Sequence, residues 1–436
     1  MIAAGLPGGL GHSGRAGIPD WCATFHETTQ PRVMSAPVKS VVVATPDIVG
    51  RRMAGPGARA WHLAEELAKH FATRLVAVIG DSPGGDNPSG AGISAADFPA
   101  SPLPGRRDPP EVIPWGSQAG LSAIRDADVV IGQPARELLS IPRGRVVFDL
   151  FDPVVLELAE LYGQHPTLRQ RLHLGAEWMR LRRALVRGDA LICGFAAQRD
   201  FYAGVHAAAS GKTEGWSDRW LEVPFGVDAT IAEGEALVLD GPPMIVWSGG
   251  IWEWLEPGLA IEAVRRVNDG GVACCLLFLG VARPGAAGPH VGRVARLEQA
   301  IEAAGPLVMV NRDWVDYRER GRWLRGCKVA IMLHRSTMES AMSIRTRFFD
   351  SVACGLPLVA SRGGFASELI EKEGLGLVAE PSDVDSVTAA IRTLLTDDAL
   401  YTRCVAGLEH LRPRLTWPAV VEPLVRRIEE WLQRQG

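Results

Sequence analysis

A strand–helix–strand pattern around residue 350 is the sequence feature that most restricts the possible folds of this chain. Two short apolar runs, Val329 to His334 and Leu358 to Ser361, have the length of buried strands. Between them, apolar residues recur at helical spacing from Ser343, a candidate N-cap, to Cys354, and Gly355 ends the pattern shortly before a proline. Such a unit predicts a parallel sheet in an α/β fold.

The same alternation of strand-length and helix-length segments recurs along the chain. The runs at Ser40 to Asp47 and Arg74 to Asp81 begin one series, and the run at Met244 begins a second. With 436 residues, two cores are expected. We therefore predict two doubly wound Rossmann-like domains that face a central cleft. The predicted boundaries are a disordered glycine-rich extension without a signal peptide at 1–37, a first domain at 38–228, a linker at 229–243, a second domain at 244–415, and a helix at 416–436 that crosses back to the first domain.

Two arginines in the first turn of the predicted helix indicate an anion site. Arg345 and Arg347 would add positive charge to the free N–H groups and dipole of the helix start, which suits a diphosphate. Asp350 follows Arg347 at i+3, so one ligand could place phosphate on the arginine and a ribose diol on the carboxylate. The alternative is an exposed intrahelical ion pair between Arg347 and Asp350. The following strand opens into a Gly-Gly turn, which favours the site.

Other candidates lie at predicted strand ends. Gly249 and Gly250 follow the first strand of the second domain and could offer N–H groups to phosphate. In the first domain, Gly55, Gly57 and Arg59 open a helix and form either an acceptor-side loop or a purely structural one.

Asp152 follows another strand of the first domain, at the edge of the sheet where catalytic residues collect. A capping role before the proline at position 153 is the alternative.

Composition excludes some functions. The net charge of −4 argues against nucleic acid as a partner, and the seven cysteines show no zinc spacing. Their usage suits a reducing cytoplasm, and no apolar run is long enough to span a bilayer. The basic stretch Arg180 to Arg187 indicates a solvated helix face or, alternatively, peripheral contact with an anionic membrane surface at its inner face.

The stretch FFDSVACGLPLVASRGG resembles the donor-site segment of the retaining glycosyltransferases of family 4, also called group 1, which have the GT-B fold. Their usual form is E-x7-E-A-x-A-x-G-x-P-V. Here Asp350 stands at the second glutamate and Met342 at the first. Ser343, Arg345 and Arg347 resemble a bacterial subgroup with S-x-R-T-R. The family usually has an arginine and a lysine where this chain has Gly250 and Leu255.

The resemblance implies a metal-independent transferase that moves a sugar from a nucleotide-diphosphate sugar to an acceptor hydroxyl with retention. The acceptor, a small molecule, a glycan or a lipid-linked one, would bind the first domain and the donor the second. In this scheme Asp152 touches the sugar, and His334 and Glu339 line the sugar end. The diphosphate and base are held by Gly249, Gly250, Trp314, Ser343, Arg345 and Arg347, and the ribose by Asp350.

Three alternatives remain open at this stage. Sugar-nucleotide epimerases and enzymes that couple a pseudo-sugar donor share this fold. The replacements at Met342 and Leu255 also suit a GT-B-shaped binding subunit without turnover. No cofactor or resident metal is expected, because no D-x-D pair leads into an acidic cage.

Overall fold

The computed structural model describes residues 40–80, 110–141, 145–212, 217–280 and 290–433, and residues 37–436 form one compact unit. The predicted extension at 1–37 lies outside the described residues. None of the described helices combines the length and the apolar character that crossing a bilayer requires.

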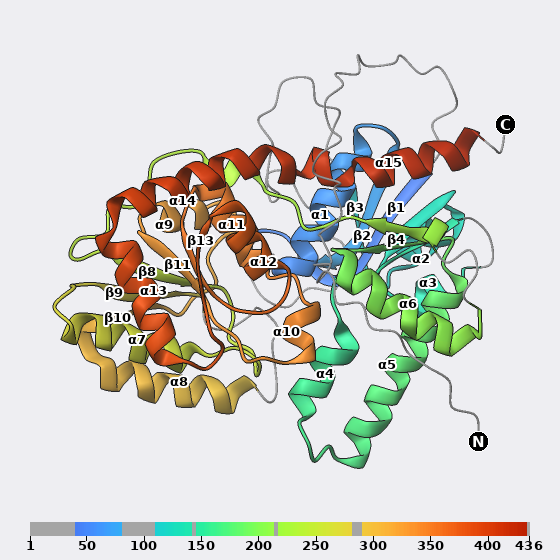
Figure 1. Ribbon diagram of the computed structural model, residues 1–436. Coiled ribbons are helices and arrows are strands. Elements are labelled where there is room, and N and C mark those ends of the chain that lie inside the picture. The colour runs from blue at the N-terminus through green and yellow to red at the C-terminus, as the bar shows by residue number, and fades with distance from the viewer. Residues whose placement is uncertain (1–39, 81–109, 142–144, 213–216, 281–289, 434–436) are drawn as a thin grey trace, which may run out of the picture. The chain divides into compact units, whose positions relative to one another are not determined.

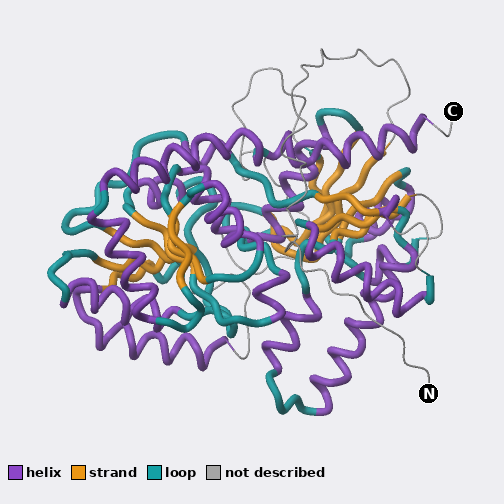
Figure 2. The backbone as a smooth tube through the Cα atoms, in the orientation of Figure 1, coloured by secondary structure: helices purple, strands orange, loops and turns teal. Residues whose placement is uncertain are grey.

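The first sheet has seven parallel strands in the order β3-β2-β1-β4-β5-β6-β7. Figure 1 labels its first four strands, and Figure 2 draws the strands in orange with purple helices around them. The inner strands of the sheet are apolar runs because helices cover both faces of a doubly wound sheet. The strands are β1 Ser40–Val49, β2 Ala72–Ile79, β3 Glu111–Pro114, β4 Val129–Gly132, β5 Arg145–Asp149, β6 Ala190–Cys193 and β7 Trp220–Glu222. The helices are α1 Gly55–Ala68, α2 Gln118–Asp126, α3 Arg136–Leu139, α4 Val154–Tyr162, α5 Leu168–Arg187 and α6 Ala196–Ser210.

The second sheet has six parallel strands in the order β10-β9-β8-β11-β12-β13. The strands are β8 Met244–Ser248, β9 Cys275–Leu279, β10 Val308–Asn311, β11 Val329–Met332, β12 Leu358–Ser361 and β13 Gly376–Ala379. Its helices are α7 Pro257–Asp269, α8 His290–Ala304, α9 Arg320–Arg325, α10 Met338–Met342, α11 Thr346–Cys354, α12 Phe365–Glu373, α13 Val384–Thr396 and α14 Asp398–Leu411. The predicted α/β class with two doubly wound sheets is confirmed.

Helix α15, Trp417–Gln433, contacts α1 and β7 of the first sheet (Figure 1). At its start, Trp417 is buried over Gly226, where an added Cβ would lie 2.3 Å from the indole Cδ2 atom. The absence of a side chain at Gly226 therefore lets the helix pack here.

The strand order reverses between β1 and β4 in the first sheet and between β8 and β11 in the second. Ligands of doubly wound sheets bind beyond the carboxyl ends of the strands at such a reversal. The loops that follow these strands are therefore where the site is expected.

Candidate functional site

A cavity of about 280 Å³ lies between loops of the two sheets, and we call it the interdomain cavity. The first sheet contributes loops that follow β1, β4 and β5, and the second contributes the turns after β8 and β9 and the start of α11. Its lining includes Asp47, Gly55, Gln133, Asp152, Gly249, Gly250, Trp314, Tyr317, Arg320, Arg345, Arg347 and Asp350. Many of the residues proposed from the sequence are thus brought together.

The helix predicted to begin at Ser343 begins later. Helix α10 ends at Met342, the chain then runs extended, and α11 starts at Thr346 with Arg345 in the N-cap position. The prediction of Ser343 as the cap is wrong because its hydroxyl donates to Glu339 Oε1 at 2.7 Å. Arg345 and Arg347 still flank the first turn of α11, where free N–H groups favour an anion.

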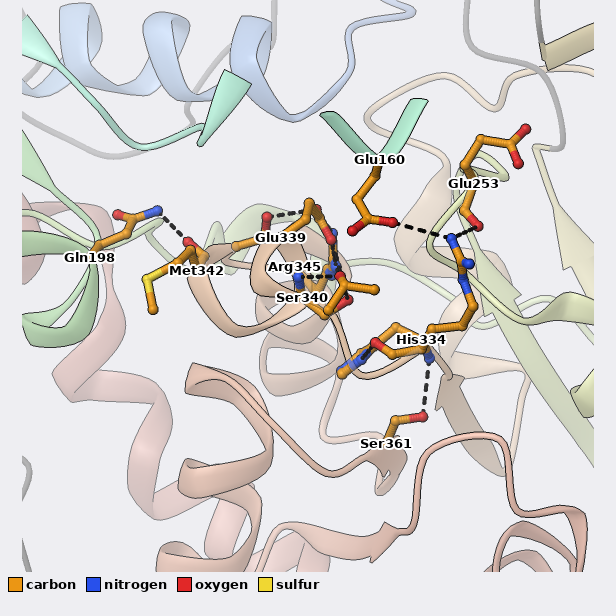
Figure 3. Close-up of polar contacts among 12 residues, drawn as sticks. Glu160, Gln198, Glu253, His334, Glu339, Ser340, Met342, Arg345 and Ser361 are labelled. Carbon is orange, nitrogen blue, oxygen red and sulfur yellow. Dashed lines mark hydrogen bonds and ion pairs between the residues drawn. The ribbon is translucent and has the colours of Figure 1, made fainter. Parts of the chain in front are cut away.

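Arg345 is held by a buried carboxylate (Figure 3). Its Nη1 and Nη2 atoms donate to the two oxygens of Glu339 at 2.7 and 2.6 Å, and the Glu339 side chain is 0% exposed. Such a bidentate pair fixes the guanidinium plane. Because Glu339 also neutralises the charge, Arg345 brings a positioned donor group to the cavity but little net charge.

Arg347 has no such partner. Its Nη2 donates to the carbonyl of Gly250 at 3.1 Å, and its Nη1 is buried without a hydrogen-bond partner among the described residues. The guanidinium also stacks over Trp247 at 5.2 Å. Burial, helped by the charge of Arg345, lowers the pKa of Arg347 to about 9. A buried cation with an unsatisfied donor is costly, so this group is prepared for an anion in the interdomain cavity.

Asp350 has a partner that the sequence did not indicate. Its Oδ1 lies 2.9 Å from Arg320 Nη2, and the Arg320 guanidinium stacks on Tyr317 at 3.8 Å. The pair predicted as an alternative, Arg347 with Asp350 in an exposed bridge, is not the one formed. Burial raises the pKa of the Asp350 carboxyl, and Arg320 opposes this. The carboxylate lines the cavity at the position proposed for a ribose diol.

This pair continues into a buried polar network that reaches the first domain. The Tyr317 hydroxyl lies 2.7 Å from His62 Nε2 of α1, and the same ring nitrogen lies 3.5 Å from Asp228 Oδ2. Burial lowers the pKa of His62 to about 4. The network joins Arg320 to His62 across distant parts of the sequence, so no local pattern could have revealed it.

The Gly249-Gly250 turn lines the cavity at the end of β8, but its two peptides differ. Gly249, with φ of +95°, donates its N–H to the carbonyl of Leu279 at 2.9 Å and so extends the sheet. Gly250 turns its carbonyl to Arg347. The Gly249 N–H is therefore already used within the sheet.

Trp314 lies between the two domains at the edge of the cavity. Its indole nitrogen lies 3.4 Å from the Met53 carbonyl of the first domain. A Cβ added to Gly280 would lie 3.4 Å from the ring, so the glycine allows close contact. The half-buried ring leaves a face beside the cavity, where the resemblance places a nucleotide base.

The three proposed catalytic residues are placed differently. Asp152 lines the interdomain cavity, and its Oδ2 accepts a hydrogen bond from Gln133 at 3.3 Å. Neither His334 nor Glu339 occurs among the described residues of the lining. Figure 3 shows His334 with its backbone N–H on Ser361, and its Nδ1 lies 3.1 Å from the Arg335 carbonyl. Burial lowers the pKa of His334 to about 4, so the ring is neutral at pH 7. Each residue contacts a residue of the lining, since Glu339 pairs with Arg345 and His334 forms an isolated bridge with Leu255.

Of the three acceptor-side candidates, Gly55 lines the interdomain cavity, whereas Gly57 and Arg59 make contacts within the first domain. Gly55 lines the cavity, but a Cβ on Gly57 would lie 2.0 Å from the Ile48 carbonyl, so Gly57 permits α1 to pack on β1. Arg59 is only 2% exposed and forms a bidentate ion pair with Asp149 at 2.7 and 3.1 Å. Its remaining donors bond backbone carbonyls, which ties α1 to the sheet rather than to a ligand.

A second cavity of about 450 Å³ lies wholly against the first domain. Its lining is largely apolar and includes Trp115, Leu158 and Tyr202. It shares Gln133 and Asp152 with the interdomain cavity. A molecule bound there would thus contact Asp152, which also lines the interdomain cavity.

Comparison with known proteins agrees with this geometry. Residues 242–397 match the family described as "Glycosyl transferases group 1". A stretch of 70 residues is 33% identical to probable sucrose-phosphate synthase 5 of Oryza sativa subsp. japonica, which is 16% of this chain and 7% of that protein. The segment that matches the family includes Arg345, Arg347 and Asp350.

Solved structures extend the likeness to nearly the whole chain. Sucrose-phosphate synthase from Thermosynechococcus elongatus superposes with a TM-score of 0.60 at 15% identity, covering 91% of this chain and 100% of the other. Anabaena HepE in complex with UDP-glucose gives a TM-score of 0.61 at 13% identity, covering 90% and 99%. At these identities the likeness shows the fold, which is the predicted GT-B arrangement of two Rossmann-like domains.

Proposed function

We propose that this protein is a glycosyltransferase of the group 1 type that takes a nucleoside-diphosphate sugar as donor. The observation that carries the proposal is Arg347, a half-buried arginine whose Nη1 atom is buried at the cavity without a hydrogen-bond partner among the described residues, beside the Gly250 turn and the start of α11. The group 1 match over 242–397 includes both elements. The structure of HepE was solved with UDP-glucose, which supports this class of donor.

In this scheme each part of the donor meets its own group. The diphosphate lies against Arg347, the Gly250 N–H and the positioned Arg345, where a charge-assisted contact contributes about 1.5 to 3 kcal/mol. The ribose diol lies on Asp350 and the base beside Trp314. The sugar then extends toward Asp152 on the first domain.

The reaction breaks the bond between the anomeric carbon and the phosphate oxygen, and the electron pair leaves with the diphosphate. The fixed positive charge stabilises this leaving group. We propose that the acceptor oxygen attacks on the same face while the departing phosphate oxygen takes its proton, which preserves the anomeric configuration. Asp152 is placed to hold the acceptor or sugar hydroxyl at the cavity's first-domain side.

The first experiment is a thermal-shift panel of UDP, GDP, ADP and dTDP sugars, followed by NMR of the product formed with the best donor. We expect one base to raise the melting temperature more than the others. Transfer to an acceptor hydroxyl or slow donor hydrolysis supports the proposal, and an epimerised free nucleotide sugar as the only product contradicts it. Binding without any turnover would instead favour a silent binding subunit.

A second experiment tests mechanism. In this proposal Arg347, the donor groups of Arg345 and the backbone N–H groups stabilise the negative charge of the departing diphosphate without a metal ion. We therefore expect the rate to change less than twofold in excess EDTA. We also expect the first product to keep the donor's anomeric configuration. A rate that falls in EDTA and recovers with Mg²⁺ or Mn²⁺, or a product with inverted configuration, would contradict the proposed stabilisation of the diphosphate by these groups.

A further inference from the structure

Helix α5 leaves an apolar stripe on the protein surface. Leu168, Leu172, Met179 and Val186 are 74, 67, 57 and 53% exposed, four of the ten large hydrophobic side chains that are exposed in the described part of the chain. They follow one another at intervals of four, seven and seven residues. At about 100° per residue, they fall within about 40° of one another around the helix. We call them the α5 stripe.

Arginines flank the α5 stripe on both sides. By the same spacing, Arg171 and Arg182 lie on one side, and Arg169, Arg183 and Arg187 on the other, and all five are exposed. The helix carries six arginines and one glutamate, Glu177, and that glutamate pairs with the sixth, Arg180. The surface around the stripe is therefore strongly positive.

The other side of α5 is already occupied. Leu181, Ala184 and Leu185 are buried in the core of the first domain, and His173 and Glu177 line the second cavity. Figure 1 shows α4 and α5 as a hairpin that extends from the first sheet. The α5 stripe thus points away from the contacts that hold the helix.

We propose that the α5 stripe and its flanking arginines dock on an anionic lipid surface. Apolar side chains along one line would enter the boundary between headgroups and acyl chains, while arginines on both sides meet lipid phosphates. Pairing with a second copy is opposed by the charge, because a self-paired α5 brings arginines against arginines. The proposal does not depend on the sugar-transfer activity.

The structure also refines which part of the basic stretch takes part. Arg180 lines the second cavity and is paired, so it faces away from the stripe. The docking face instead includes the first turns of α5, which precede the stretch Arg180 to Arg187 that the sequence singled out.

The test is flotation of the full-length protein with vesicles of phosphatidylcholine alone or with 30% phosphatidylglycerol. Three variants are compared with wild type: Leu172→Glu with Met179→Glu, Arg169→Glu with Arg183→Glu, and the control Val238→Glu, which changes a side chain 83% exposed outside α5. All sites are exposed, so folding should be kept, and unchanged circular dichroism and nucleotide-induced thermal shift would show it.

We expect wild type and Val238→Glu to float with the anionic vesicles only, and each double variant to lose at least tenfold in bound fraction. Salt at 0.5 M should weaken wild-type binding. Equal flotation of all variants, or none for wild type, overturns the proposal. So does a wild-type dimer in light scattering that the stripe variant converts to monomer, because the stripe would then be a self-association surface. Nucleotide binding measured without vesicles tests the proposed function separately.

Discussion

Replacing Arg347 by methionine should weaken nucleotide binding while it stabilises the empty protein. The two effects have opposite signs because the same guanidinium is costly without an anion and useful with one. A substitution of a residue that contributes to both the fold and the site would lower both the nucleotide affinity and the stability of the empty protein. Weaker binding together with higher stability therefore distinguishes Arg347 from such a residue.

The size of the stability effect follows from the pKa. Burial, helped by the charge of Arg345, lowers the pKa of Arg347 from its ordinary value to about 9, and one pKa unit corresponds to about 1.4 kcal/mol. For a base with a lowered folded-state pKa, the charged form is penalised at every pH below about 9, so the cost of about 5 kcal/mol is fully present at pH 7. Methionine removes this cost but loses the Gly250 hydrogen bond and the stacking on Trp247. A net gain of about 1 to 3 kcal/mol remains.

The assay combines urea unfolding of the empty protein with calorimetry of a nucleoside diphosphate and its nucleoside. Arg347→Met should raise the urea midpoint, lower diphosphate affinity by about 10- to 150-fold, and leave nucleoside binding within twofold. Arg426→Met, at a side chain 61% exposed on α15, is the control and should change neither. A lower urea midpoint, or equal losses for both ligands, would refute the assignment of Arg347 as an unpaired cation that awaits phosphate.

Three other predictions follow from the same contacts. Glu339→Gln should raise the KM for the donor more than it lowers kcat, because Arg345 loses its bidentate partner while the residues of the cavity lining are unchanged. Steady-state kinetics in which kcat falls more than KM rises would show instead that Glu339 touches the sugar. Gly226→Ala should cost about 1 to 3 kcal/mol in urea unfolding, because its Cβ would lie 2.3 Å from Trp417, whereas Gly204→Ala, with open space around it, should not destabilise. The pKa of His62 is lowered to about 4, so folding favours its neutral form. The contribution of His62 to the free energy of unfolding is therefore complete above pH 6.5, and about 3 kcal/mol of it is lost as the pH falls to 4. His62→Gln should flatten the plot of unfolding free energy against pH in this range.

The sequence predicted the sheets because buried parallel strands are apolar runs. The edge strand β3 gives little sequence signal, because it has four residues and only one of them is buried. Apolar residues at helical spacing between Val154 and Arg187 likewise do not show where one helix ends and the next begins. The structure breaks this segment at Gly163, where φ of +64° ends α4, and restarts it at the Thr167 capping box.

The candidate site was only partly predictable, because the sequence shows charges but not their partners. Arg59 and its partner Asp149 lie 90 positions apart, and Arg320 and Asp350 belong to different helices. Even the nearby pair of Glu339 and Arg345 depends on a break between α10 and α11 that helix periodicity does not announce. Hence the pattern treated Arg345 and Arg347 alike, whereas the structure pairs Arg345 with Glu339 and leaves the Nη1 atom of Arg347 without a hydrogen-bond partner among the described residues.

Leu255 places an apolar side chain at the interdomain cavity where a cation is expected. The group 1 resemblance leads one to expect a lysine at this position, but Leu255 is 1% exposed, belongs to the apolar core and pairs with His334 in an isolated bridge. Leu255 also lines the interdomain cavity, so at this position the wall offers an apolar side chain and no charge. Arg347 reaches the Gly250 turn from α11 instead, and its stacking on Trp247 keeps the guanidinium beside β8. We propose that Arg347, on α11, supplies positive charge at the end of β8, where Leu255 supplies none.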